Sequence, residues 1–191
     1  GGYESLIGGS AAESLSVLTG WPVMQFTIAE EDEEILFAKL LSCSERGYLM
    51  VLSSTPEADA CRQAGLRPSH VYSILCVYSD VRSRVESDGE RLLRIRNPHG
   101  RGEWKGDWSA NSHLWSDELR AALGYERGVN DGDDGTFFMN FGDVKRFFHS
   151  ATICPVRERK AGWVETRASL SVPADWHRPQ PILRVEVFET C

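Results

Sequence analysis

Two short stretches decide the fold: Gly65-Leu-Arg-Pro-Ser-His70-Val-Tyr-Ser-Ile-Leu75 and Leu93-Arg-Ile-Arg-Asn97-Pro-His-Gly100. In the first, a loop runs into an apolar segment with the character of a strand, and His70 stands at the junction. In the second, a strand-like segment ends at Asn97, and the following proline disfavours the helical backbone region for that residue. Each stretch therefore predicts a polar side chain at one end of a β-strand.

His70 and Asn97 are candidate catalytic residues. An imidazole at a strand end can face a cleft from a rigid backbone, as a general base requires. An amide can accept the ring N–H and set the tautomer, as the third member of a catalytic triad does. Two alternatives stay open, because a single histidine is more often structural and Asn97 is also typical of a turn. The catalytic hypothesis predicts an Asn97 oxygen within about 3.5 Å of a ring nitrogen of His70, flanked by His99 beside an apolar, exposed face.

The surrounding pattern predicts the α+β class. The capping box Ser10-Ala-Ala-Glu13 predicts a helix over residues 10–19, and helical spacing of apolar residues predicts another over 32–46. Apolar runs separated by Gly-, Asp- and Pro-bearing loops then predict antiparallel strands and short helices. The strands are expected at 48–53, 70–78, 92–96, 136–141, 162–172 and 181–188, and the short helices at 112–123 and 142–149.

Composition limits the classes of partner. The 191 residues carry 28 acidic and 21 basic side chains, and the net charge of -7 argues against nucleic acid or an anionic membrane surface. No apolar run approaches the roughly 20 residues of a membrane span, and the opening Gly1-Gly-Tyr3 stretch has neither the basic nor the apolar region expected of a secretory signal. The five scattered cysteines have neither zinc nor disulfide-framework spacing, which favours a reduced, cytoplasmic setting.

Four linked motifs, taken in order, resemble the calpain family of cysteine proteases. They are Tyr3-Glu-Ser-Leu-x-Gly8-Gly9-Ser10, Gly65-Leu-x-x-x-His70-x-Tyr-Ser, Arg94-x-Arg-Asn97-Pro-x-Gly-x-x-Glu103-Trp104-x-Gly106-x-Trp108-Ser109 and Asp134-Gly135-x-Phe137-Phe138-Met139. The resemblance implies the second, His- and Asn-bearing subdomain of a papain-like core over residues 1–156. Such a subdomain is an antiparallel sheet or half-barrel with short flanking helices. Residues 157–191 are expected to be strands that begin a following β-sandwich.

The resemblance gives His70 the role of the base and Asn97 that of its orienting amide. The nucleophile would lie in the Cys-bearing subdomain of the same protein, because no cysteine of this chain follows Gln and precedes Trp at a helix start. The implied function is half of an intracellular calpain-like endopeptidase that cleaves proteins or peptides. The chain alone is expected to be inactive.

Two departures from the family pattern affect that interpretation. His99 stands where a tryptophan usually shields the His–Asn bond. Calpains also bind Ca²⁺ in this half, where Glu103 and Asp134 remain as metal ligands but Ala110 and Thr136 replace two acidic positions. Because calcium affinity follows the number of carboxylates, a weak site is expected. A non-catalytic calpain homologue that acts as a binding or scaffold module is the alternative hypothesis.

Overall fold

A computed structural model of the chain describes residues 8–82, 89–102, 104–125 and 134–156. The chain divides into two units, Gly1–Arg157 and Glu158–Cys191, and the described residues belong to the first. The strands expected over 162–172 and 181–188 lie outside the described residues. The division into domains 1–156 and 157–191 therefore stays a prediction.

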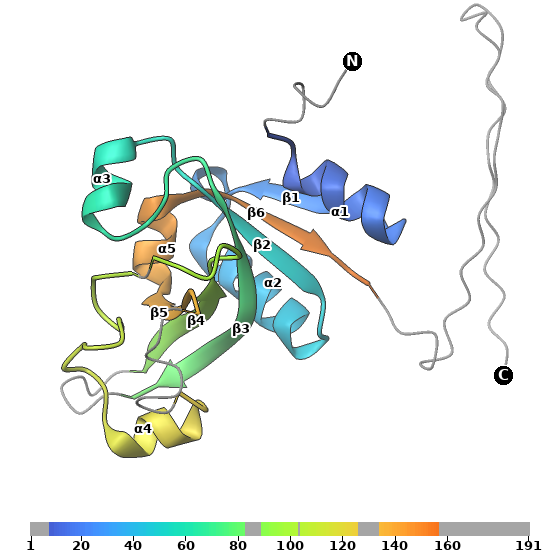
Figure 1. Cartoon of the computed structure of the whole chain (residues 1–191). Helices are drawn as coiled ribbons and strands as arrows, with labels where there is room; N and C mark the ends of the chain where they lie inside the picture. The colour runs from blue at the N-terminus through green and yellow to red at the C-terminus, as the bar shows by residue number, and fades with distance from the viewer. Residues whose placement is uncertain (1–7, 83–88, 103, 126–133, 157–191) are drawn as a thin grey trace, which may run out of the picture. The chain divides into compact units, whose positions relative to one another are not determined.

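The described residues form a six-stranded antiparallel sheet with the order β1-β6-β2-β3-β4-β5 (Figure 1). Its strands are β1 (Met24–Thr27), β2 (Leu49–Ser54), β3 (Val71–Val81), β4 (Glu90–Arg96), β5 (Thr136–Asn140) and β6 (Phe148–Cys154). The helices are α1 (Ala11–Thr19), α2 (Glu33–Glu45), α3 (Ala58–Gln63), α4 (Asp117–Ala122) and α5 (Phe141–Phe147), with a 3-10 turn η2 (Ile28–Glu30). The predicted α+β class with an antiparallel sheet and short helices is confirmed, while the papain-like half-barrel stays a prediction.

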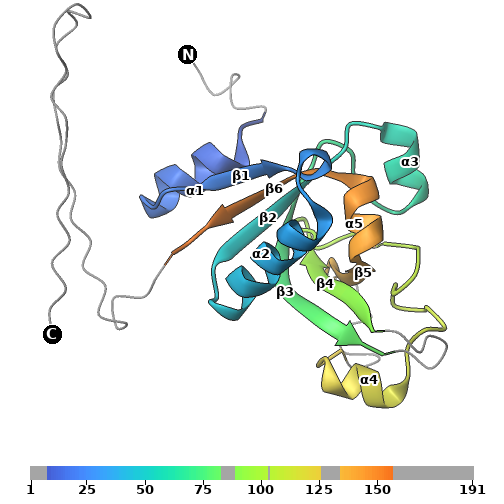
Figure 2. The ribbon, with the colours of Figure 1, turned by 180° about the vertical axis from the view of Figure 1, so that it is seen from behind.

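One face of the sheet carries the main hydrophobic core and is covered by α2 (Figure 2). Alternate residues of β2 point into this core, because side chains of a strand alternate between its faces. Met50 lies opposite Ile74 of β3, and Leu52 lies opposite Tyr72. All four side chains are buried. This packing holds the β2–β3 pair rigidly, and His70 immediately precedes β3.

Helices α1 and α2 begin and end at the predicted signals. The Ser10 hydroxyl accepts from the main-chain N–H of Glu13, and the Asp32 carboxylate accepts from Ile35 at 3.1 Å. Gly20 follows α1 in the left-handed conformation, with φ 72°. Side-chain caps satisfy main-chain donors at the helix start, and glycine tolerates the left-handed turn at its end.

A second cluster of buried aromatic and aliphatic side chains packs around the 104–125 segment. It contains Val81, Leu92, Trp108, Leu114, Trp115, Tyr125 and Phe138. The Trp115 indole donates to the main-chain oxygen of Ser109 at 2.9 Å. Trp108 has φ 65°, which is unusual for a large side chain, and its complete burial holds it there. The cluster therefore fixes a long irregular connection to the sheet.

Besides the 3-10 turn η2, three elements were not predicted: β1, α3 and β6. Helix α3 has six residues, too few for an apolar periodicity to stand out. β6 pairs with both β1 and β2, and its Ala151 and Ile153 face the core. Its outer positions carry hydroxyls and an imidazole, so it lacks the continuous apolar character by which the other strands were identified.

Several expected boundaries are wrong. The helix expected over 142–149 ends at Phe147, and β6 begins at Phe148. The helix expected over 112–123 begins only after Ser116, whose hydroxyl accepts from Leu119 at 3.1 Å. Ser112 instead forms a local turn with the N–H of Leu114. The strand expected over 136–141 ends at Asn140, because that side chain caps α5 through the N–H of Asp143 at 2.7 Å. Within the described residues, no helix combines the length and apolar character that crossing a membrane requires.

Candidate active site

His70 and Asn97 lie at the same end of the antiparallel β3–β4 pair. His70 directly precedes β3 and Asn97 directly follows β4, and Ser73 pairs with Arg96 between them. His70 Nε2 lies 3.0 Å from Asn97 Oδ1. The expected contact between the two side chains is confirmed, while their catalytic roles stay predictions.

The contact sets the protonation of the His70 ring. An amide oxygen only accepts hydrogen bonds, so Nε2 carries the proton and donates to Asn97. In the neutral imidazole, Nδ1 then holds the lone pair. No described residue hydrogen-bonds to that nitrogen, so it is available as a base.

Ser54 at the end of β2 fixes the backbone that carries His70. The Ser54 hydroxyl donates to the main-chain oxygen of Arg67 at 2.6 Å and accepts from the N–H of His70 at 3.0 Å. The main-chain N–H of Ser54 also donates to the oxygen of His70 at 2.9 Å. Ser69, between Arg67 and His70, has φ 49°, a backbone conformation that residues other than glycine seldom adopt. The hydrogen bonds to Ser54 therefore hold the turn before His70 in one conformation. The role of Ser54 was not predicted from the sequence.

Asn97 is completely buried and all its polar atoms are engaged. Its Oδ1 also accepts from the main-chain N–H of His99 at 3.1 Å, and its Nδ2 donates to the oxygen of Arg101. Its main-chain N–H donates to Gly135 at 2.8 Å. The expected turn character of Asn97 is present as well, since Gly100 donates to its main-chain oxygen. The residue therefore closes a turn and aims an amide oxygen at His70 simultaneously.

His99 flanks the pair as expected, with its ring centroid 4.6 Å from that of His70 in an edge-on arrangement. The edge of Tyr72 approaches His70 as well, with ring centroids 5.1 Å apart. Burial lowers the pKa of His70 below its ordinary value. The hydrogen bond to Asn97 opposes this lowering, whereas positive charge at His99 and Arg67 adds to it.

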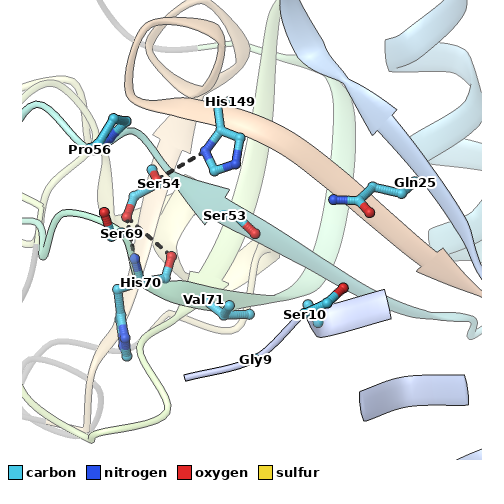
Figure 3. A pocket seen from close by; sticks show the side chains of 11 residues that line it. Gly9, Ser10, Gln25, Ser53, Ser54, Pro56, Ser69, His70, Val71 and His149 are labelled. Atoms are coloured by element: carbon cyan, nitrogen blue, oxygen red, sulfur yellow. Dashed lines mark hydrogen bonds between the residues drawn. The ribbon is translucent and has the colours of Figure 1, made fainter. Parts of the chain in front are cut away.

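A hollow of about 600 Å³ lies beside His70 between the ends of β2 and β3 and the start of α1 (Figure 3). Most of its lining residues are small or polar, including Ser10, Gln25 and Ser53. His149 of β6 lines it as well, with Nδ1 3.0 Å from the main-chain oxygen of Ser54. Neither Asn97 nor His99 lines this hollow, so the expected apolar, exposed face beyond that pair stays a prediction.

The cysteines in the described residues are free thiols engaged elsewhere. Cys61 is buried in α3 against Thr55, within 3.7 Å of its main-chain oxygen. Burial raises the pKa of Tyr78 to about 12, and the interaction with Cys76 on the same strand adds to this rise. Burial raises the pKa of Cys43. None of the described thiols hydrogen-bonds to His70, and Cys191 lies outside the described residues.

The predicted calcium ligands are tested only in part by the structure. Glu103 lies outside the described residues. Asp134 is exposed, and its carboxylate accepts from the N–H of Thr136 at 2.7 Å. The described part of the chain brings together no group of three or more acidic, histidine or cysteine side chains suited to a metal ion. Calcium binding therefore stays a prediction.

Comparison with known proteins identifies similarity over most of the chain. The profile of the calpain family cysteine proteases matches residues 1–155. Mouse calpain-9 is 35% identical over 163 residues, covering 81% of this chain and 22% of calpain-9. The calpain-type cysteine protease DEK1 of Arabidopsis thaliana is 31% identical, covering 84% of this chain and 7% of DEK1. Drosophila melanogaster calpain-B is 33% identical over 159 residues, covering 81% of this chain and 17% of calpain-B. The chain thus spans about a fifth or less of the length of these relatives.

Proposed function

Because this chain belongs to the calpain family of cysteine proteases, we propose that it supplies the base and its orienting amide to a calpain-like endopeptidase. His70 is the base and Asn97 the amide. The observation that carries the proposal is the 3.0 Å bond from His70 Nε2 to Asn97 Oδ1. The nucleophilic cysteine comes from a separate Cys-bearing subdomain of the same protein, and the substrates are proteins or peptides.

In the proposed reaction His70 works through Nδ1. This nitrogen takes the proton of the cysteine thiol, and the resulting thiolate attacks the carbonyl carbon of the scissile peptide bond. The imidazolium then gives the proton to the leaving amine. A water molecule, deprotonated by the same nitrogen, releases the acyl group. Asn97 holds the ring in the tautomer that leaves Nδ1 free.

Reconstitution with the Cys-bearing half, either in trans or in the full-length parent protein, tests the proposal. The readout is kcat/KM on a fluorogenic peptide. His70→Ala should reduce it by about 10²–10⁴-fold, the usual contribution of a general base. Asn97→Ala should cause a smaller loss, because the ring stays present but is no longer oriented. Exposed His113, which lies in the turn before α4, provides the matched control His113→Ala, and this variant should keep full activity.

Unchanged activity in His70→Ala would contradict the catalytic assignment. Hydrolysis by the isolated chain, abolished by replacing one of its own cysteines, would contradict the need for a second half. Restored activity in trans supports both parts of the proposal.

His99 supports a second candidate function, that of a non-catalytic calpain homologue which binds other proteins. An exposed imidazole shields the His70–Asn97 bond from water less well than the tryptophan usual in calpains. The sequence upstream of this chain in its gene distinguishes the two candidates. A Gln…Cys-Trp-Phe segment there favours the protease, and another residue at the cysteine position favours the binding module.

We also propose that any calcium site in this half is weak, with Glu103 and Asp134 as its ligands. Two carboxylates fall short of the six to eight oxygens that Ca²⁺ takes, so main-chain oxygens and water would supply the rest.

A further inference from the structure

Two imidazoles meet edge to face at the candidate active site. The ring centroids of His70 and His99 are 4.6 Å apart, and the rings are inclined at 60°. One atom holds both residues in place: Asn97 Oδ1 accepts a hydrogen bond from His70 Nε2 and another from the main-chain N–H of His99. The His70 ring cannot move away without loss of its bond to the buried amide, and the same oxygen holds the main chain of His99 beside it.

We propose that His99 is a positioning residue for His70, which covers the ring when neutral and opposes its protonation when charged. For its catalytic consequence this inference rests on the proposed function. Two positive rings less than 5 Å apart repel, so the pair binds its second proton less readily than its first. His99 is exposed, whereas His70 is half-buried.

The groups around the pair leave this repulsion uncompensated. Arg67, in the loop before His70, adds positive charge that acts in the same direction as His99. Tyr72, whose ring packs edge-on against that of His70, is held neutral because burial raises its pKa. The described residues that line the hollow beside His70 include a second imidazole, His149, and no carboxylate. No negative charge in these contacts offsets the positive one.

The consequence for catalysis is a shift in the acid limb of activity. In the proposed mechanism His70 takes the thiol proton only in its neutral form, and positive charge at His99 opposes protonation of His70. The assembled enzyme should therefore keep activity to a lower pH than an enzyme with an uncharged aromatic ring at position 99.

Three forms of the full 191-residue chain distinguish the effect of a positive charge at position 99 from that of an aromatic ring covering His70. They are the wild type, His99→Phe and His99→Lys. Phenylalanine keeps an aromatic cover without a proton, and lysine keeps a positive charge without a ring. The measurement is the titration of the His70 ring nitrogens by long-range ¹H–¹⁵N NMR. The His70 midpoint should rise in His99→Phe by about 0.5 to 1 pKa unit, the effect that Coulomb's law gives for charges about 5 Å apart in largely aqueous surroundings. In His99→Lys the midpoint should be no higher than in wild type.

Equal His70 midpoints in the phenylalanine and lysine forms would overturn the inference, and so would an unchanged midpoint in His99→Phe. His113→Phe is the matched control for the loss of an exposed imidazole, and it should leave the His70 midpoint unchanged. In the reconstituted enzyme, the acid limb of kcat/KM should move to higher pH in His99→Phe by a similar amount. Absence of activity in every form would contradict the proposed function, while the NMR titration would still decide the role of His99.

Discussion

Asn97 can face His70 in one orientation only. Its Oδ1 receives two donors, His70 Nε2 and the N–H of His99, while its Nδ2 faces the main-chain oxygen of Arg101. Rotation of the amide by 180° would bring an NH₂ group against two donors and an oxygen against a carbonyl. Because the residue is completely buried, water cannot repair those contacts. The amide oxygen is therefore fixed toward the imidazole before any substrate or second subdomain is present.

The lowered pKa of His70 makes the stability of the chain pH-dependent. Since burial holds the folded-state pKa below the unfolded value near 6.5, the unfolded chain binds more protons between the two values. His70 should therefore contribute stability above pH 6.5 that is lost as the pH falls through the folded-state pKa. Urea denaturation from pH 7.5 to 5 should give a falling free energy of unfolding, with a smaller fall in His70→Gln.

Exposed His113 again provides the control. His113→Gln should keep the wild-type pH dependence, because His113 is exposed in the turn before α4 and does not contact His70 in any described interaction. If His70→Gln and wild type lose the same free energy on acidification, His70 is not responsible for the pH dependence.

Ser54 should be the residue outside the candidate pair that most affects the position of His70. Ser54→Ala removes the acceptor for the N–H of His70 and the donor to the main-chain oxygen of Arg67. Because Ser54 is buried, the N–H of His70 loses a partner that water cannot easily replace, at a cost of about 1–3 kcal/mol. Urea denaturation checks the loss, and the ring signals of His70 should shift in NMR spectra.

The neighbouring variant Ser53→Ala is matched in chemistry and strand. Ser53 is only half-buried and lines the hollow, so its replacement should cost less than about 0.5 kcal/mol. Equal losses in the two variants would show that the bonds to His70 and Arg67 contribute little.

At the scale of elements, the β3–β4 pair brings the site together. Antiparallel pairing places the start of one strand beside the end of the next, so His70 and Asn97 meet although 27 positions separate them. The end of β4 is also held by the turn before β5, because the N–H of Asn97 donates to Gly135 at 2.8 Å. The orientation of the amide therefore depends on a glycine in another loop.

Gly135→Ala should displace Asn97. Gly135 has φ +77°, and a Cβ there would lie 2.6 Å from the main-chain oxygen of Asn97. Gly47 provides a matched control, with φ +68° and no atom within 4 Å of the added carbon. Gly47→Ala should cost about 1 kcal/mol for the left-handed backbone alone. Gly135→Ala should cost clearly more in urea denaturation and should move the His70 ring signals, and equal costs would contradict the role of the close contact.

Local signals predicted part of this structure, and long-range pairing decided the rest. The caps at Ser10 and Asp32 were readable because capping is settled within a few residues. The pairing of His70 with Asn97 was predicted because both ended apolar segments and lay in motifs of a known family. β6 was missed, although it lies between β1 and β2, because half of its positions are polar on a sheet face that the core does not cover. Ser54 was missed for a similar reason, since its partners become neighbours only when β2 pairs with β3.

The sheet as a whole has two different faces. One face is apolar and meets α2, whereas the opposite face along β1, β6 and β2 carries Gln25, Thr152, Ser150 and Ser53. The Ser150 and Thr152 hydroxyls are buried there, and no hydrogen-bond partner for either lies among the described residues. The hollow beside His70 opens on this polar side (Figure 3). A proteolytic cleft must bind the polar backbone of a peptide, so hydrogen-bonding side chains beside the candidate base agree with the proposed function.

Calcium should stabilise the chain only slightly. A ligand that binds only the folded state adds RT ln(1 + [L]/Kd), about 2.7 kcal/mol at a hundredfold excess over Kd. Asp134 is exposed and already accepts from Thr136, and Ala110 and Thr136 occupy two positions at which the resemblance to calpains predicts acidic ligands. We therefore expect 1 mM Ca²⁺ to raise the melting temperature by no more than a few degrees, and Asp134→Ala to abolish even that rise.

Asp117→Ala, which removes an exposed carboxylate from the start of α4, is the control and should leave the calcium response unchanged. A rise of many degrees that Asp134→Ala reverses would mean that main-chain oxygens and nearby acidic residues complete a strong site despite the two replacements.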